Sequence, residues 1–365
     1  MNVTQVPALD AIARLDTYSA IIDARSEDEF TEDHLPGALN WPSLNNEERK
    51  LIGTIYKQVN PFEAKKRGAA LVAANIARHI ERELLDKPKS WQPLIYCWRG
   101  GKRSNSLALV LGQIGLRVAV LEGGYKAFRG AVLASLPELA ASLSYCVICG
   151  PTGSGKTRLL QALAQAGAQV LDLEALASHR SSVLGQIPGE TQPSQKRFDN
   201  LVWDALRQFD AARPVYVESE SKKVGNLAVP DALIAAMRAS PCLDLQLPEP
   251  ERVALLLEDY RFFVQDTAMF CARLDALTAL RGRAVVQGWH DKVNAGEIET
   301  VVRELLATHY DPGYARSIAR NFSQYEISKK IAPVDRSARA MAKLAHEILA
   351  QAEGETQEPL GVPGI

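Results

Sequence analysis

The sequence predicts an α/β protein with two parallel-sheet domains, the second of which carries additional helices. In three places, beginning at Ala20, Leu94 and Tyr145, a short apolar run is followed by a loop and a helical stretch. That order is typical of parallel sheets covered by helices. A chain of 365 residues is also longer than one hydrophobic core usually serves. We expect a first domain over residues 1–136, a second over 137–350 and a flexible tail over 351–365.

The composition is typical of soluble globular proteins and gives no general attraction to nucleic acid. Lys and Arg total 42 and Asp and Glu total 43, so the net charge is -1. Any binding site for a polyanion must therefore be local. The N-terminus lacks a basic segment followed by an apolar run, and no apolar stretch of about 18 residues occurs. We expect a cytoplasmic protein without a membrane span.

The five cysteines form an odd-numbered set, which favours free thiols over a disulfide framework in such a protein. Cys146 and Cys149 have the C-x-x-C spacing of a redox pair or of half a zinc site. On a strand these side chains would point to opposite faces, and no second Cys or His pair lies nearby to complete four ligands. We expect both to pack as small apolar residues, and we expect no stable prosthetic group.

The strongest motif is the glycine-rich loop that follows the apolar run at residues 147–149 and precedes a helical stretch at 158–166. It fits the spacing G-x-x-x-x-G-K-S/T. In such a loop the backbone N–H groups converge on phosphate oxygens, and the lysine and the helix N-terminus add positive charge. The sequence therefore predicts a diphosphate-binding loop made of Gly150, Pro151, Thr152, Gly153, Ser154, Gly155, Lys156 and Thr157.

Two more strands of this domain are predicted at residues 169–173 and 214–219, and both end in acidic side chains. Asp172, Glu218 and Glu220 are candidate acids near the phosphate-binding loop. In nucleotide hydrolases a strand-end acid holds Mg²⁺, so a magnesium site at Thr157 is one interpretation. The usual aspartate is replaced by Glu218, which argues against ATP hydrolysis and leaves diphosphate binding intact. Helix capping by Glu218 or Glu220 is an equally good interpretation.

Cys97 is the candidate nucleophile of the first domain. It follows a predicted strand and begins a basic, glycine-rich loop that leads into a helix. Three cations within six residues and the helix N-terminus favour the thiolate, which is the reactive form of cysteine. We expect the loop to bind an anion through Trp98, Arg99, Gly100, Gly101, Lys102, Arg103 and Ser104.

The run IIDARSEDEFTEDHLPGALNWP, the Cys97 loop and VAVLEGGYKAFR, in this order, resemble a rhodanese domain. The resemblance implies that Cys97 carries a transferable sulfur or selenium. The spacing C-x-x-x-x-x-R from Cys97 to Arg103 is shared with cysteine-dependent phosphatases, in which the arginine clamps a phosphate. Tyr96 stands where such phosphatases usually carry His. A loop of this size suits phosphate, thiophosphate and selenophosphate, so the spacing leaves both chemistries open.

A rhodanese-like domain followed by a P-loop domain, with CWRGGKRS in the first and GPTGSGKT in the second, resembles the bacterial tRNA 2-selenouridine synthase family over about residues 10–350. The resemblance implies a tRNA substrate with 2-thiouridine at the wobble position. The family transfers a geranyl group from geranyl diphosphate to that sulfur and then replaces the S-geranyl group with selenium from selenophosphate, which implies a selenophosphate supplier as a partner. Two other classes stay open: a sulfurtransferase or phosphatase coupled to a kinase-like P-loop domain, and a non-catalytic RNA-binding protein.

Three further segments could contact a substrate. The charged stretch 41–89, with KKR at 65–67, is either a solvated face or a surface that grips RNA. The long polar loop 177–200, with His179 and Arg180, is typical of a lid or binding segment. Beyond Pro241 we expect mostly helices, and the basic and aromatic segment 314–330 either grips RNA or packs its aromatic side chains in the core.

Overall fold

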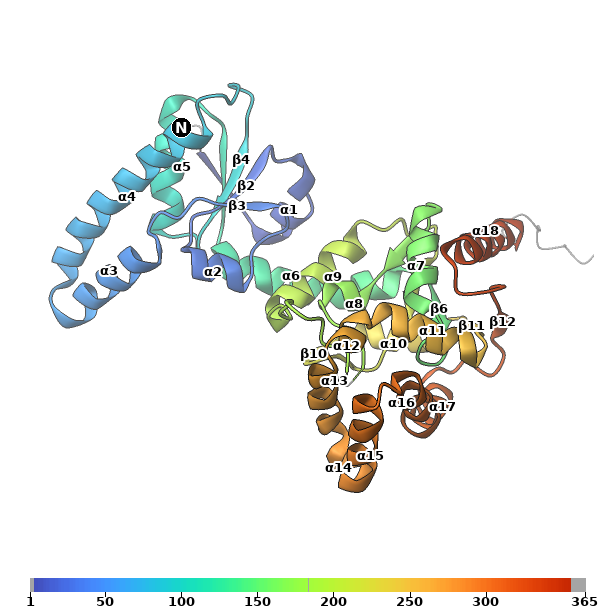
Figure 1. Cartoon of the computed structure of the whole chain (residues 1–365). Helices are drawn as coiled ribbons and strands as arrows, with labels where there is room; N and C mark the ends of the chain where they lie inside the picture. The colour runs from blue at the N-terminus through green and yellow to red at the C-terminus, as the bar shows by residue number, and fades with distance from the viewer. Residues whose placement is uncertain (1–2, 183, 356–365) are drawn as a thin grey trace, which may run out of the picture. The chain divides into compact units, whose positions relative to one another are not determined.

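The computed structural model describes residues 3–182 and 184–355 (Figure 1). The chain divides into two compact units. The first is the chain up to Pro137 together with Pro193–Asp204, and the second is Glu138–Gln192 together with the chain from Ala205 onward. Each unit contains a five-stranded parallel sheet, which confirms the predicted fold class. Within the described ranges, no helix is long and apolar enough to cross a membrane.

The sheet of the first unit has the strand order β1-β5-β4-β2-β3, and all its pairings are parallel. The central strand β4 is buried at every position, as expected for a parallel strand covered on both faces. The strands are β1 (Val3–Val6), β2 (Ala20–Asp23), β3 (Ala38–Asn40), β4 (Pro93–Tyr96) and β5 (Val118–Leu121). The helices that accompany them are α1 (Ala8–Ile12), η1 (Leu15–Thr17), α2 (Glu27–Glu32), α5 (Lys102–Ile114) and α6 (Gly124–Ser142).

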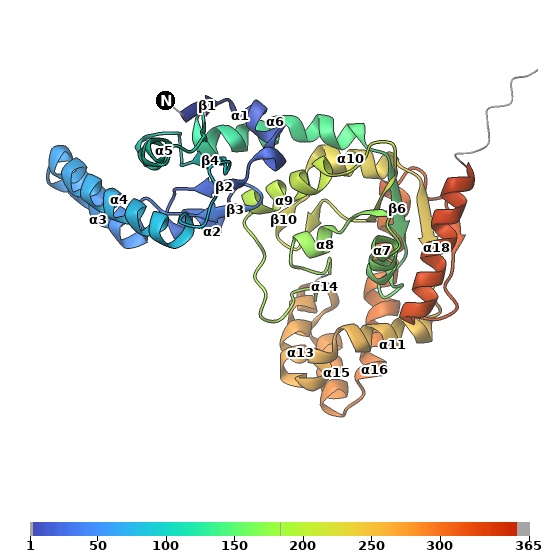
Figure 2. The ribbon, with the colours of Figure 1, turned by 90° about the horizontal axis from the view of Figure 1, so that it is seen from above.

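A pair of helices, α3 (Asn46–Gln58) and α4 (Pro61–Glu83), is inserted between β3 and β4. Asn45 caps α3 by accepting a hydrogen bond from the Glu48 N–H, and Asn60 caps α4, whose first residue is a proline. The two helices lie side by side and project from the sheet of the first unit in both views (Figures 1 and 2).

The first unit also includes a segment that is distant in sequence, the start of α9 (Gln195–Arg207). The Asn200 side chain donates hydrogen bonds to the Asp33 carboxylate at 3.1 Å and to the His34 carbonyl at 2.5 Å. Arg129 forms an ion pair with Asp199. The end of the predicted loop 177–200, from Gln195 onward, is therefore helical and packs within the first unit.

The sheet of the second unit has the order β12-β11-β6-β8-β7, again with parallel pairings throughout. Its strands are β6 (Tyr145–Cys149), β7 (Gln169–Leu171), β8 (Val215–Glu218), β11 (Cys242–Leu245) and β12 (Lys329–Ile331). A short antiparallel pair, β9 (Lys223–Val224) and β10 (Leu227–Ala228), lies outside it. Beyond Pro241 the chain is mostly helical, as expected, and the sequence analysis did not identify β11 and β12, because three- and four-residue strands leave too short a pattern to recognise.

Two cores stabilise the second unit. One joins the sheet to α7 (Lys156–Gln165) and α18 (Ala338–Glu355), and it includes Leu159, Leu163, Met341 and Ile348. The other is made of helices and contains Trp289 at its centre. The remaining helices are α8 (Leu173–Leu176), α10 (Asp231–Ala239), α11 (Glu249–Asp259), α12 (Arg261–Gln265), α13 (Thr267–Leu274), η2 (Asp275–Leu277), α14 (Thr278–Arg281), α15 (Arg283–Asn294), α16 (Ile298–Leu305), η3 (Leu306–Tyr310) and α17 (Asp311–Asn321).

The last helix, α18, extends into the segment predicted as a tail. α18 continues to Glu355, five residues beyond the predicted end of the second domain at residue 350. Residues 351–353 are Gln, Ala and Glu, all of which favour helix. The rest of the predicted tail, residues 356–365, lies outside the described residues.

Candidate functional sites in the two units

Cys97 lies at the carboxyl end of β4, the strand at the centre of the first sheet. Its side chain is nearly buried, and its Sγ accepts a hydrogen bond from the Gly101 N–H and another from the Ser104 hydroxyl, each at 3.2 Å. Both donors stabilise negative charge on the sulfur, and the N-terminus of α5 adds to this. The predicted loop therefore places two hydrogen-bond donors and a helix N-terminus beside the Cys97 sulfur.

Two glycines allow α6 to approach the Cys97 loop closely. The Tyr125 N–H at the start of α6 donates to the Cys97 carbonyl at 2.8 Å. A Cβ on Gly124 would lie 2.2 Å from that carbonyl oxygen and 2.5 Å from the Gly100 nitrogen, and Gly124 has a φ of 60°. Gly100 has a φ of 65°, which also favours glycine. Gly100 and Gly124 are thus required to close the loop against α6.

The three cations of the Cys97 loop have different environments. Arg99 and Lys102 are exposed, whereas Arg103 donates to the Glu29 carboxylate at 2.7 Å. Arg103 also lowers the pKa of Glu29, although burial opposes this effect. The arginine that a phosphatase would use to clamp a phosphate is therefore engaged in an ion pair. The aromatic ring of Trp98 stacks on Tyr125 at 5.4 Å and closes one side of the loop.

The phosphate-binding loop follows β6, the central strand of the second sheet. After β6 the chain first adds strands β7 and β8 on one side of it and later strands β11 and β12 on the other side. Such a switch point creates a crevice at the carboxyl ends of the strands. The Lys156 ammonium donates to the Gly150 carbonyl at 2.8 Å, and the Gly150 N–H donates to the Tyr314 hydroxyl. Ser154 is fully buried. The loop is thus folded on itself around its lysine, as the motif requires.

Arg252 on α11 supports the loop from outside the motif. It is 7% exposed, and its Nε and Nη2 donate to the Thr152 carbonyl at 2.9 and 2.7 Å. It also forms an ion pair with Asp311 at 2.6 Å. The sequence around Arg252 does not predict this role, because its partners Thr152 and Asp311 lie about 100 and about 60 residues away along the chain.

Three carboxylates face the phosphate-binding loop, of which Glu218 and Glu220 are buried and Glu174 is half-buried. Oxygens of Glu174, Glu218 and Glu220 lie within 4.8 Å of one another. Burial, followed by repulsion from Glu174, raises the pKa of Glu218 to about 8, while Lys156 opposes the shift. Burial raises the pKa of Glu220 and of Glu174 as well. Within the described residues, Glu218 Oε1 is buried and has no hydrogen-bond partner.

The structure thus corrects the helix-capping interpretation of these acids. Neither Glu218 nor Glu220 caps a helix. Asp172 does so instead, accepting a hydrogen bond from the Ala175 N–H at the start of α8 at 2.8 Å. The third member of the acid cluster is therefore Glu174 and not Asp172.

A deep cavity in the second unit brings these groups together. Its walls include the loop residues Thr152, Gly153, Gly155, Lys156 and Thr157, and the acids Asp172, Glu174, Glu218 and Glu220. His179 and Arg180, from the predicted lid, line it too. Arg180 is held there by a hydrogen bond to the Asp259 carbonyl at 2.8 Å and by the face of Tyr260. Burial lowers the pKa of His179, which favours the neutral imidazole.

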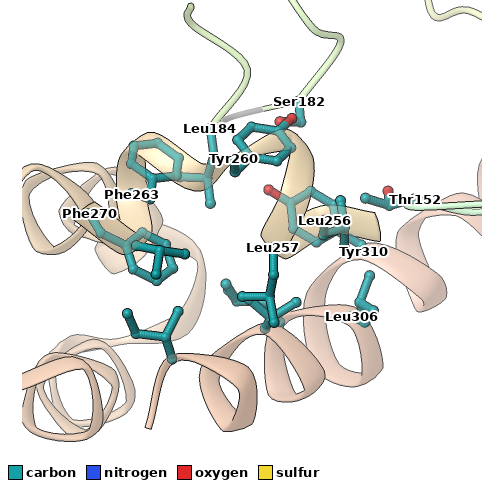
Figure 3. Close-up of a pocket in the computed structure, with 14 residues that line it drawn as sticks. Thr152, Ser182, Leu184, Leu256, Leu257, Tyr260, Phe263, Phe270, Leu306 and Tyr310 are labelled. Atoms are coloured by element: carbon teal, nitrogen blue, oxygen red, sulfur yellow. The ribbon is translucent and has the colours of Figure 1, made fainter. Parts of the chain in front are cut away.

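A second cavity opens beside the first and is almost wholly apolar (Figure 3). Thr152 of the phosphate-binding loop lies at one end, and Phe263 and Phe270 lie at the other. The two cavities share the lining residues Thr152, Ser182, Leu256, Tyr260 and Tyr310, so they lie side by side. Sequence analysis missed this cavity, because its walls come from separate helices of the second unit.

The two cysteines with C-x-x-C spacing take no part in either site. Cys149 is fully buried and Cys146 is half-buried, and both are free thiols. Cys149 has Cys242 on the neighbouring strand β11 as its thiol partner.

Comparisons with known proteins follow the same two-unit division. The family described as tRNA 2-selenouridine synthase AAA domain matches residues 143–281, and the Rhodanese-like domain family matches residues 8–131. The tRNA 2-selenouridine synthase of Aeromonas salmonicida (strain A449) is 31% identical over 342 residues, which is 86% of this chain and 91% of that protein.

The chain belongs to the tRNA 2-selenouridine synthase family. The synthase of Alcanivorax borkumensis is 33% identical over 82% of this chain and 90% of that protein. The synthase of Nitrosomonas europaea is 38% identical over 66% of this chain and 63% of that protein. The family expected from the two motifs is therefore confirmed. In this tRNA 2-selenouridine synthase family member, each motif lies at the carboxyl end of the central strand of its sheet.

Proposed function

We propose that this protein acts on cytoplasmic tRNA with 2-thiouridine at the wobble position, in two steps. The second unit transfers a geranyl group from geranyl diphosphate to the 2-thio sulfur, and the first unit supplies selenium from selenophosphate to replace the S-geranyl group. The observation that supports this proposal is the apolar cavity that continues from the phosphate-binding loop. A nucleotide would need polar partners for its ribose and base beyond the phosphates, whereas a prenyl chain needs the apolar walls found here.

The diphosphate end of geranyl diphosphate fits the loop around Lys156. Attack of the thiouridine sulfur on the first carbon of the geranyl group breaks the carbon–oxygen bond and releases diphosphate. The loop amides, Lys156 and the N-terminus of α7 face the negative charge that develops on this leaving group. Arg252 keeps Thr152 in place through its carbonyl.

The prenyl end fits the apolar cavity. The apolar side chains that line this cavity match the chemistry of a ten-carbon prenyl chain. Each buried methylene contributes roughly 0.8 kcal/mol. Leu257, Phe263, Val302 and Leu305 line the cavity away from the loop, so burial of the chain there would favour geranyl diphosphate over inorganic diphosphate.

The residues beside the loop also fit a magnesium ion. The Thr157 hydroxyl interacts with Glu218, whose Oε1 has no hydrogen-bond partner within the described residues, and oxygen ligands are what Mg²⁺ prefers. Thr157 and Glu218 would hold the ion, with Glu174 and Glu220 behind them. Bound Mg²⁺ would supply positive charge to the diphosphate.

The Cys97 loop fits selenophosphate. The seven-residue spacing from Cys97 to Arg103 suits a tetrahedral anion, and Arg99 and Lys102 are exposed on this loop. Cys97 is the catalytic residue there, because its sulfur lies at the start of this loop and accepts hydrogen bonds from the Gly101 N–H and the Ser104 hydroxyl.

The proposal is tested by mass spectrometry of wobble nucleosides. 2-Thiouridine tRNA is incubated with geranyl diphosphate alone, with selenophosphate alone and with both. We expect S-geranyl-2-thiouridine in the first case and 2-selenouridine only when both are present. Selenation without geranyl diphosphate would contradict the two-step order.

A variant isolates the role of the apolar cavity. Val302→Trp fills part of the cavity on α16 without touching the phosphate-binding loop. We expect geranyl diphosphate to bind at least tenfold more weakly, on the order of the loss of two buried methylenes, and inorganic diphosphate to bind as before. Val285→Trp, at an exposed valine on α15, is the matched control. Equal weakening of both ligands would show that the cavity does not hold the prenyl chain.

A further inference from the structure

The α3–α4 arm, defined as residues 46–83, is not used by the proposed chemistry. Its helices contain 13 and 23 residues, which corresponds to lengths of about 20 and about 35 Å. The arm projects from the sheet of the first unit in both views (Figures 1 and 2). Such a projection presents a long surface to a partner.

The outer half of the arm, residues 50–67, is strongly basic, although the whole chain has a net charge of -1. It contains one acid, Glu63, and five cations, all of them exposed: Lys50, Lys57, Lys65, Lys66 and Arg67. Of these five, only Lys66 forms an ion pair with another described residue, namely Glu63. Four unpaired cations on one projection attract a polyanion.

The tip of the arm exposes apolar and aromatic side chains. Tyr56 is 54% exposed, Val59 is 73% exposed and Phe62 is 65% exposed. The Lys66 ammonium lies 5.1 Å from the centre of the Phe62 ring. Exposed aromatic rings among cations are the groups on which unpaired nucleobases stack.

The other basic and aromatic segment, residues 314–330, has a different environment. Phe322 is 5% exposed, and the Tyr314 hydroxyl accepts a hydrogen bond from Gly150 of the phosphate-binding loop. Phe322 and Tyr314 therefore pack within the second unit. This favours the interpretation that segment 314–330 places its aromatic side chains in the core. The α3–α4 arm, in contrast, has both exposed cations and exposed aromatic rings.

The root of the arm is fixed beside the Cys97 loop. Arg49, in the first turn of α3, binds the same Glu29 carboxylate that binds Arg103 of the loop, at 3.2 and 2.7 Å. Asn75 on α4 donates to the Ser43 carbonyl at 3.2 Å and to the Glu48 carboxylate at 2.6 Å. An RNA held along the arm is consequently held next to the loop that carries Cys97.

We propose that the α3–α4 arm is a tRNA-binding surface of the first unit. The cations of residues 50–67 contact phosphates, and Tyr56 and Phe62 stack on unpaired bases. This inference rests on tRNA being the substrate, as in the proposed function. It adds the surface that receives the tRNA and the two kinds of contact that it makes.

The test compares three variants with the wild type in binding to a fluorescein-labelled, unmodified tRNA transcript, by anisotropy at several salt concentrations. The first replaces Lys57, Lys65 and Arg67 with Gln. Each lost phosphate contact reduces the slope of log affinity against log salt by about 0.7 to 0.9, so we expect a slope smaller by about 2 to 3 and binding roughly 50-fold weaker at about 0.15 M salt. The second variant, Tyr56→Ala with Phe62→Ala, should weaken binding roughly tenfold or more with an unchanged slope.

The matched control replaces three exposed cations of the second unit, Arg316, Arg320 and Arg339, with Gln. We expect it to bind as the wild type does, and all variants to unfold at the wild-type temperature. Unchanged affinity in the arm variants, or an equal loss in the control, would overturn the inference. So would a change in sedimentation of the Tyr56 and Phe62 variant without a change in RNA affinity, because the tip would then contact a second copy of the chain. Failure of the wild type to bind the transcript would instead count against the proposed function.

Discussion

Replacing Glu218 with Gln should stabilise the ligand-free protein, and the size of the effect follows from the burial of this side chain. Glu218 is 4% exposed and faces two other carboxylates. Burial and Glu174 raise its pKa from 4.5 to about 8. Between these two values the folded protein binds a proton that the unfolded chain releases, so stability falls as pH rises, by about 1.4 kcal/mol per pH unit. At pH 7 this amounts to roughly 3 kcal/mol.

The neutral amide of Gln removes this contribution. We expect Glu218→Gln to be more stable than the wild type by roughly 3 kcal/mol at pH 7, with the difference vanishing near pH 4.5. Urea unfolding followed by tryptophan fluorescence, to which the buried Trp289 of the same unit contributes, measures it across this pH range. Glu138→Gln, at an exposed glutamate, makes the same chemical change without burial and should leave stability unaltered. A Glu218 variant that is less stable at pH 7, or whose advantage does not depend on pH, would refute the reasoning. Addition of Mg²⁺ with inorganic diphosphate should stabilise the wild type more than the variant.

Four further predictions concern the two loops. Cys97→Ser should abolish selenium incorporation into tRNA while tRNA binding persists, and any remaining 2-selenouridine by mass spectrometry would contradict the role of the thiol. Lys156→Ala should weaken the binding of geranyl diphosphate by about 1.5 to 3 kcal/mol in calorimetry, because one charged contact to the diphosphate is lost. Arg252→Lys should weaken the same binding by roughly tenfold, because one ammonium cannot replace the paired hydrogen bonds to the Thr152 carbonyl, and no change would rule out this positioning role. Gly124→Ala should destabilise the first unit by about 3 kcal/mol or more in urea, since its Cβ would overlap the Cys97 carbonyl, whereas Gly130→Ala on the same helix meets no atom within 4 Å and should stabilise it by up to about 1 kcal/mol.

The sequence by itself determined both loops and the fold class. The GPTGSGKT motif and the Cys97 loop are continuous stretches in which the reactive group, its backbone donors and the following helix are adjacent in the chain. Their chemistry is therefore local, and the strand before each loop can be recognised from its apolar residues. Parallel sheets with these strands at their centres place both loops at crevices, which the strand orders confirm.

The tertiary structure alone decided what surrounds the loops. The apolar cavity takes its walls from Thr152 and from helices more than 100 residues later, and Arg252 supports Thr152 across the same distance. Glu174 joins Glu218 and Glu220 only because two strand ends lie side by side in the sheet. Likewise, the structure shows that Phe62 is exposed at the tip of the arm, whereas Phe322 is buried in the second unit. Such neighbours depend on packing between distant segments, and neither spacing nor periodicity along the chain contains that information.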